Sequence, residues 1–168
     1  MRTEPAASGA ARGVVRGIGA FSALLGVLGL AALVAVVALA PGEVGVVDTL
    51  LGVALSAATL AAGVGLWRGA RWGGPLALAV WAAQILTVAV GAWAWRWTLG
   101  PYFHLRLGPG AARGTAYGLG LHADVRPMED GFTDYVALNV VAAVVVAVLA
   151  AALHYARRSS NDAPPSLT

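Results

Sequence analysis

The chain of 168 residues contains no cysteine, and its 11 basic residues are all arginine. The absence of cysteine excludes disulfide bonds, thiolate metal sites and cysteine nucleophiles. The absence of lysine, combined with a high content of alanine, glycine and valine, is typical of a GC-rich prokaryotic coding sequence. This bias describes the source genome and predicts no function.

Charged residues are also scarce. They make up 11% of the chain, whereas hydrophobic residues make up 59% and the mean hydropathy is +0.76. Such a chain cannot cover itself with polar surface, so we expect the lipid bilayer to be its solvent. The net charge of +3 does not indicate nucleic acid as a partner, because the arginines are scattered at the ends of apolar runs and form no basic stripe.

Four apolar runs are long enough to cross a hydrocarbon core of about 30 Å. They predict an all-α integral membrane protein, a four-transmembrane-helix bundle with a long external loop between its third and fourth helices. The expected parts are a cytoplasmic tail at 1–16, spans at 17–40, 49–67, 73–97 and 132–155 within a transmembrane domain at 17–156, an external loop at 100–131, and a disordered cytoplasmic tail at 157–168.

A cleaved signal peptide is the alternative interpretation of the first span, since Ala38-Leu39-Ala40 has the form of a cleavage site. The apolar run is longer than the 7–15 residues of a signal peptide, and Pro41 would directly follow the cut. Both features favour a retained span.

The third expected span is flanked by tryptophan and arginine at both ends. Tryptophan prefers the headgroup layer, because its ring is apolar and its N–H needs a polar partner. The predicted interface anchors are Trp67, Arg68, Arg71, Trp72, Trp93, Trp95 and Trp97. The segment Leu66–Trp72, followed by Gly-Gly-Pro-Leu-Ala-Leu, resembles a turn in uncharacterised small four-span membrane proteins of bacteria and archaea. The resemblance covers about 20 residues around Leu66–Leu78 and carries over no functional residue.

The distribution of arginine predicts the orientation. The two tails and the 68–71 turn carry seven arginines, whereas the 41–48 connector carries none. The positive-inside rule therefore places both termini in the cytoplasm and residues 100–131 outside. We expect a multi-pass protein of the prokaryotic inner membrane.

The long connection at 100–131 is rich in glycine and proline. Phe103, Leu105 and Leu107 alternate with polar residues, and Leu119 and Leu121 begin a second alternating run. Period-two patterns on both sides of a Gly-Pro-Gly sequence favour a small β-hairpin cap. An irregular loop with a short interfacial helix is the alternative.

Small and polar residues recur within the expected spans. They are interpreted either as helix-packing residues or as the lining of a polar path, and they are Gly52, Ser56, Thr59, Gln84, Thr87 and Asn139. Helices in lipid associate through close packing at small residues and through hydrogen bonds, which favours the packing interpretation. No charged residue lies deep in any span, and this counts against a pump or an ion-coupled carrier.

One set of residues could hold a metal ion. His104, His122 and Asp124 fall on one face of the proposed hairpin and offer imidazole and carboxylate ligands. The alternative is that they are solvated polar residues of the external loop. No Ser-His-Asp order, phosphate loop or nucleotide fingerprint is visible, so we predict no catalytic residue and no cofactor.

These observations lead to three hypotheses. The first is a non-enzymatic accessory, scaffold or interaction subunit of a membrane complex, with a protein partner or as a homo-oligomer. The second is a small channel or carrier with a polar path around Gln84. The third is a membrane enzyme or metal-binding protein that uses His104, His122 and Asp124.

Overall fold

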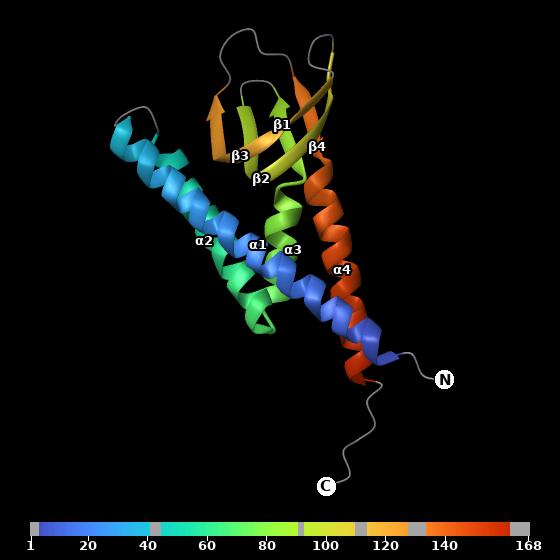
Figure 1. The fold of residues 1–168 in the computed structure, drawn as a ribbon. Coiled ribbons are helices and arrows are strands. Elements are labelled where there is room, and N and C mark those ends of the chain that lie inside the picture. Colours follow the sequence, from blue (N-terminus) through green and yellow to red (C-terminus); the bar gives the residue numbers. More distant parts are fainter. Residues whose placement is uncertain (1–3, 41–44, 91–92, 110–113, 128–133, 162–168) are drawn as a thin grey trace.

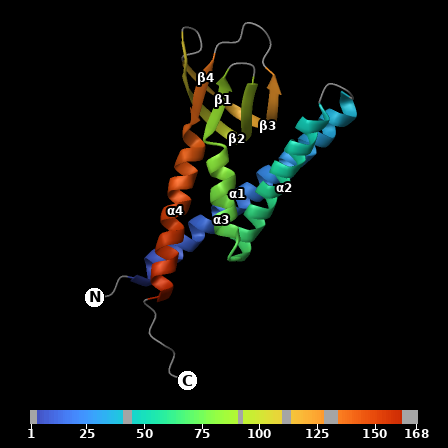
Figure 2. The ribbon, with the colours of Figure 1, turned by 180° about the vertical axis from the view of Figure 1, so that it is seen from behind.

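The computed structural model describes residues 4–40, 45–90, 93–109, 114–127 and 134–161. Within these residues, helices lie below a single antiparallel sheet (Figure 1). The elements are α1 (Glu4–Leu39), α2 (Val46–Arg68), α3 (Gly73–Ala83), β1 (Leu86–Val90), β2 (Trp93–Leu107), β3 (Gly114–Pro127), β4 (Tyr135–Asn139) and α4 (Val140–Asn161). The helices α3 and α4 support the sheet, since α3 leads into β1 and β4 leads into α4, as the reverse view also shows (Figure 2).

The prediction of an all-α four-helix bundle is wrong, because a four-stranded sheet is part of the fold. The expected span at 73–97 is helical only as far as Ala83 and continues as strand from Leu86. Its second half is rich in β-branched and aromatic residues, which favour strands. Trp95 and Trp97 also alternate with smaller or charged residues at the strand period of two.

The expected external loop at 100–131 belongs to the same sheet. β2 and β3 pair in antiparallel register from Trp93↔Pro127 to Arg106↔Gly114. Phe103, Leu105 and Leu119 therefore lie in a hairpin, but this hairpin begins before Gly100 and is joined to two further strands. It is an integral half of the fold, and not a small cap placed over a finished bundle.

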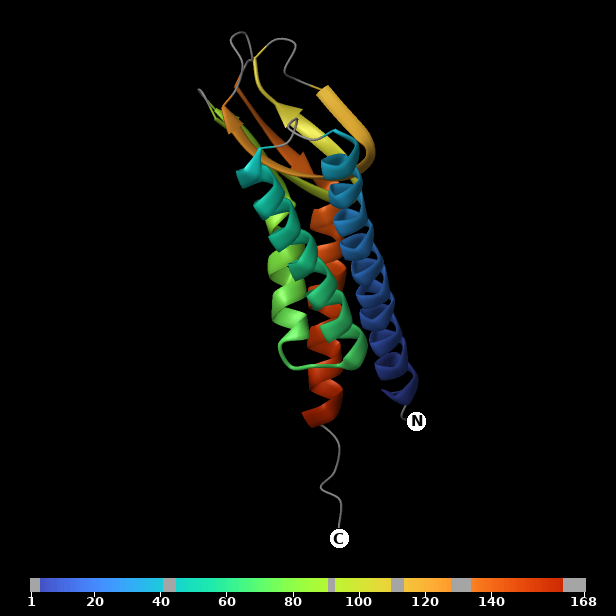
Figure 3. The same cartoon turned by 90° about the vertical axis from the view of Figure 1, so that its left-hand side faces the viewer.

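Three helices are long and apolar enough to cross a membrane, judged by length and composition. They cover Gly9–Leu39, Val46–Arg68 and Val140–Arg158. The helix α3, with 11 residues, is only about 16 Å long. All the helices run beside one another below the sheet (Figure 3).

Glycine allows α1 and α2 to approach closely. A Cβ atom on Gly63 would lie 2.3 Å from the backbone nitrogen of Ala23, and one on Gly26 would lie 2.5 Å from that of Leu60. Further along, a Cβ atom on Gly29 would lie 2.6 Å from the Ser56 hydroxyl. The small residues predicted on the second span thus face α1. Helices in lipid associate in this way, through close packing at small residues, because lipid provides no hydrophobic driving force between them.

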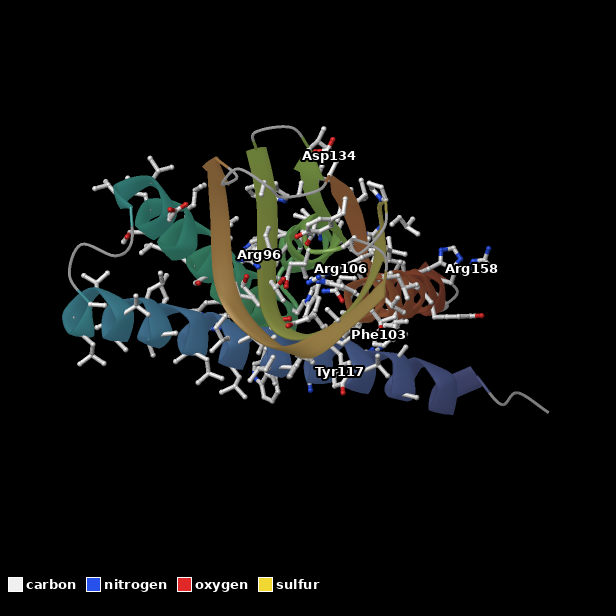
Figure 4. The ribbon with its side chains drawn as sticks, turned by 90° about the horizontal axis from the view of Figure 1, so that it is seen from above. Arg96, Phe103, Arg106, Tyr117, Asp134 and Arg158 are labelled. Carbon is white, nitrogen blue, oxygen red and sulfur yellow. The ribbon has the colours of Figure 1, made fainter. Side chains whose placement is uncertain are left out.

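Three strands of the sheet close into a ring. β1 pairs antiparallel with β4 and with the first residues of β2, while β4 pairs antiparallel with the last residues of β2. Straight strands cannot satisfy all three pairings, so β2 must reverse its direction between its two ends. The hairpin is accordingly bent into a U when it is seen from above (Figure 4).

Gly100 lies between the two paired ends of β2. Its φ angle is +110°, a value that residues with a side chain rarely adopt. It stands opposite Gly120 in β3, and a Cβ atom on Gly100 would lie 2.7 Å from Leu25 of α1. Closure of the ring therefore depends on a residue without a side chain at this position.

Candidate functional site: the inner face of the ring

The alternation of burial in the ring is the reverse of that in a sheet exposed to water. Apolar side chains point outward and are 37–69% exposed; we call them the outer belt, and they are Leu86, Val90, Leu105, Leu107, Val136 and Leu138. The inner face carries small and polar side chains that are buried, namely Thr87, Ala89, His104, Ala137 and Asn139. The polar groups of the ring are thus collected inside it.

The register brings residues from distant parts of the chain into one layer. Thr87 stands opposite Ala137, which stands opposite Arg106 in the second half of β2. Arg96 comes from the first half of the same strand, and in Figure 4 Arg96 and Arg106 both lie within the curve of the hairpin. The Arg106 guanidinium lies 5.4 Å from the centre of the Tyr135 ring, a cation–π contact.

A second polar layer lies closer to the helices. His104 stands opposite Asn139, and its ring centre lies 4.7 Å from that of Tyr102. Thr98 is also buried there. The hydroxyl oxygens of Thr87 and Thr98 are buried, and neither makes a hydrogen bond to any group that the structure describes. Buried polar atoms normally have a partner, so these two hydroxyls could bond to water or to a small polar ligand.

Two side-chain amides join the ring to the helices. Asn139 ends β4 and caps α4, because its Oδ1 atom accepts a hydrogen bond from the backbone N–H of Ala142 at 3.4 Å. The same atom accepts from the backbone N–H of Phe103 at 3.4 Å. Gln84 ends α3, and its Oε1 atom accepts from the backbone N–H of Leu99 at 2.9 Å. Both amides are buried, and these bonds give them a structural role.

Replacement of Gln84 by alanine is expected to lower the free energy of unfolding by about 1–3 kcal/mol, because the buried N–H of Leu99 loses its acceptor. Thermal unfolding of the purified protein in mild detergent, followed by tryptophan fluorescence, measures the change. Thr49→Ala is the control, since it removes an exposed bond to the Gly45 carbonyl and should change stability by less than about 0.5 kcal/mol. Equal effects of the two substitutions would contradict the structural role of Gln84.

The predicted metal ligands are spread along the hairpin. His104 stands opposite Ala116 and Asn139, His122 opposite Thr98, and Asp124 opposite Arg96. The side chains of His122 and Asp124 lie outside the described residues. Among the side chains that are described, no group of three or more histidine, aspartate and glutamate residues could hold a metal ion. The metal site therefore stays a prediction.

The other predicted residues fall into two groups. Trp67, Trp72, Arg68 and Arg71 are exposed around the α2–α3 turn, as interface anchors would be, whereas Trp97 is 2% exposed and packs among the helices. Trp95 packs beside it, and the side chain of Trp93 lies outside the described residues.

On α2, Gly52 faces Leu33 of α1, and the Thr59 hydroxyl donates to the Leu55 carbonyl at 2.7 Å.

A hydrogen bond that sequence reasoning missed connects α1 to α3. The indole N–H of Trp81 donates to the Ser22 hydroxyl at 3.0 Å, and both residues are buried. The ring of Phe21 stacks on that of Trp81, with ring centres 6.2 Å apart. The hydroxyl of Ser22 within an apolar run was the available signal, but it identifies no partner.

Ser22→Ala should lower the free energy of unfolding by about 1–3 kcal/mol, because the buried indole N–H of Trp81 loses its acceptor. The double variant Ser22→Ala/Trp81→Phe should be less destabilised than the sum of the two single variants. A double-mutant cycle by thermal unfolding tests this, and additive losses would show that the bond contributes nothing.

Comparison of the chain with protein-family models, curated proteins and solved structures found no match. The resemblance of the Leu66–Leu78 segment to small four-span membrane proteins therefore stays a prediction.

Proposed function

We propose that this protein is a multi-pass membrane protein that acts as a non-enzymatic accessory or interaction subunit. Its three long apolar helices support insertion in a membrane. The first residues of α1, the last residues of α4 and the arginine-bearing α2–α3 turn lie at the end of the helices away from the sheet (Figure 1). This arrangement supports an orientation in which both termini are cytoplasmic and the sheet lies toward the opposite side of a prokaryotic inner membrane.

The observation that carries the proposal is the direct connection between the sheet and the helices. No linker separates β4 from α4, and Gln84 and Asn139 bond the strands to the ends of α3 and α4. A sheet held in this way is presented rigidly to a partner. The side-chain amides of Gln84 and Asn139, which could have lined a transport path, are instead hydrogen-bonded to backbone groups. This favours the role of a scaffold over that of a carrier.

Affinity purification of the full chain from a mild detergent, followed by mass spectrometry, tests the interaction role. We expect a partner in stoichiometric amount, or a defined homo-oligomer. A protein that purifies as a lone monomer under these conditions would contradict the proposed role.

The orientation can be tested separately, because the natural chain has no cysteine. Single cysteines replace Pro109, which is exposed after β2, and Arg71, which is exposed before α3. A membrane-impermeant maleimide added to intact spheroplasts should label Pro109→Cys, and should label Arg71→Cys only after lysis. The opposite pattern would reverse the topology.

A small-molecule carrier or binding protein is the second candidate. It is favoured by the buried hydroxyls of Thr87 and Thr98, which have no partner among the described groups. A path through Gln84 predicts loss of flux in reconstituted Gln84→Ala protein. Unchanged flux would remove Gln84 from the path.

A further inference from the structure

The lengths of α3 and β1 indicate where the ring lies relative to a membrane. The helix α3 begins two residues after Arg71, has 11 residues and is about 16 Å long. This is only half of a hydrocarbon core of about 30 Å. The five residues of β1 add about 16 Å. Helix and strand together match the core, whereas the helix alone ends in the middle of it.

The surface of the ring is suited to that depth. The outer belt is apolar, with Leu86, Leu138 and Leu105 side by side across three strands. It continues from β4 into the exposed apolar face of α4, where Val144 is 55% exposed. A sheet in water would place these side chains inside, whereas β-structure in lipid has its apolar residues outside and its polar residues inside.

Backbone pairing in the ring meets the other requirement of a lipid environment. Unpaired strand edges are not tolerated in hydrocarbon, because each unsatisfied N–H or C=O group costs several kcal/mol. β1 has β4 on one side and the start of β2 on the other, and β4 lies between β1 and the end of β2. Closure thus leaves these two strands with neighbours on both sides.

We propose that β1, β4 and the end of β2 lie within the outer half of the bilayer, with the outer belt against lipid acyl chains. The third membrane crossing is then part helix and part strand, whereas α4 is long enough to cross by itself and β4 lengthens the fourth crossing at its outer end. The polar inner face is shielded from lipid by the strands themselves. This inference rests on the membrane insertion proposed above. Lipid is favoured over a second copy of the chain because the belt is continuous with the exposed apolar face of α4.

Nitroxide labels on single cysteines test the depth of the belt. The positions are Leu138 in the belt, Val144 on α4 as the control for insertion, and Arg71 as the aqueous control. The full-length variants are reconstituted in vesicles of phosphatidylcholine and phosphatidylglycerol. Collision rates are then measured with oxygen, which concentrates in hydrocarbon, and with a water-soluble nickel chelate.

The oxygen-to-nickel ratio at Leu138 should lie within about twofold of that at Val144 and be about tenfold above that at Arg71. Leu86→Cys, in the same row of the sheet, should give the same result and serves if Leu138→Cys does not fold. An aqueous ratio at Leu138 with a lipid ratio at Val144 would overturn the inference and leave membrane insertion standing. Aqueous ratios at both positions would overturn insertion itself.

A third pattern would identify a different occupant. If the Leu138 label is shielded from both reagents, protein covers the belt and the lipid assignment is wrong. Spin–spin broadening between copies would then identify the cover as a second copy of this chain, and its absence would identify another segment of the same chain.

Discussion

Gly63→Ala should destabilise the protein by about 2 kcal/mol or more, although alanine is the better helix former by about 1 kcal/mol. The added Cβ atom would lie 2.3 Å from the backbone nitrogen of Ala23 and 2.6 Å from the carbonyl oxygen of Gly19. Both are backbone atoms of α1, so no side-chain rotation relieves the overlap and the two helices must separate. The loss is measured by thermal unfolding in detergent.

Gly17→Ala is the matched control for this substitution. Gly17 lies in the interior of α1, and a Cβ atom there would have no neighbour within 4 Å. Gly17→Ala gives the same gain in helix propensity without an overlap between helices, so the free energy of unfolding of this variant should rise by about 0.5–1 kcal/mol. Equal responses at the two positions would show that α1 and α2 do not pack as described.

Gly100→Ala should destabilise the protein by about 3 kcal/mol, because two effects add. The φ angle of +110° is strained for alanine, at about 1–3 kcal/mol. The Cβ atom would also lie 2.7 Å from Leu25 of α1, and overpacking costs about 1–3 kcal/mol. Thermal unfolding gives the sum of the two effects.

The background variant Leu25→Ala separates them. It removes the side chain that the new Cβ atom would meet, but it leaves the φ angle unchanged. Gly100→Ala should therefore still be destabilising in the Leu25→Ala background, by a smaller amount. Full tolerance there would show that the bend of β2 does not require a left-handed residue at this position.

The sequence predicted the long apolar helices more successfully than the third span. Gly73–Trp95 is an uncharged run of the right length for a helix, and length alone cannot distinguish a helix from a helix followed by a strand. The alternation of Trp95 and Trp97 with Arg96 was a strand signal, but it was interpreted as an interfacial belt. Pairing of β1 with β4 joins residues that are far apart in the chain, and no local pattern specifies such a contact.

The candidate site was predicted in its residues but not in its arrangement. Gln84, Thr87 and Asn139 were expected within membrane-spanning helices, and they lie instead at the end of α3, in β1 and at the end of β4. The partners of Gln84 and Asn139, the backbone groups of Leu99 and Phe103, belong to a strand that was expected to be a helix end and a loop. The inner face became visible only once the ring was known.

Disulfide formation between Leu86→Cys and Leu138→Cys tests most directly the pairing of β1 with β4, without which the ring cannot form. The two residues are opposite each other in β1 and β4, and the neighbouring bond from the N–H of Asn139 to the carbonyl of Ile85 makes theirs a pair without mutual hydrogen bonds. Side chains in such pairs are close enough for a disulfide. We expect efficient crosslinking under mild oxidation in membranes, and little for the out-of-register pair Leu86→Cys/Val136→Cys. Equal crosslinking of both pairs, or of neither, would contradict the ring.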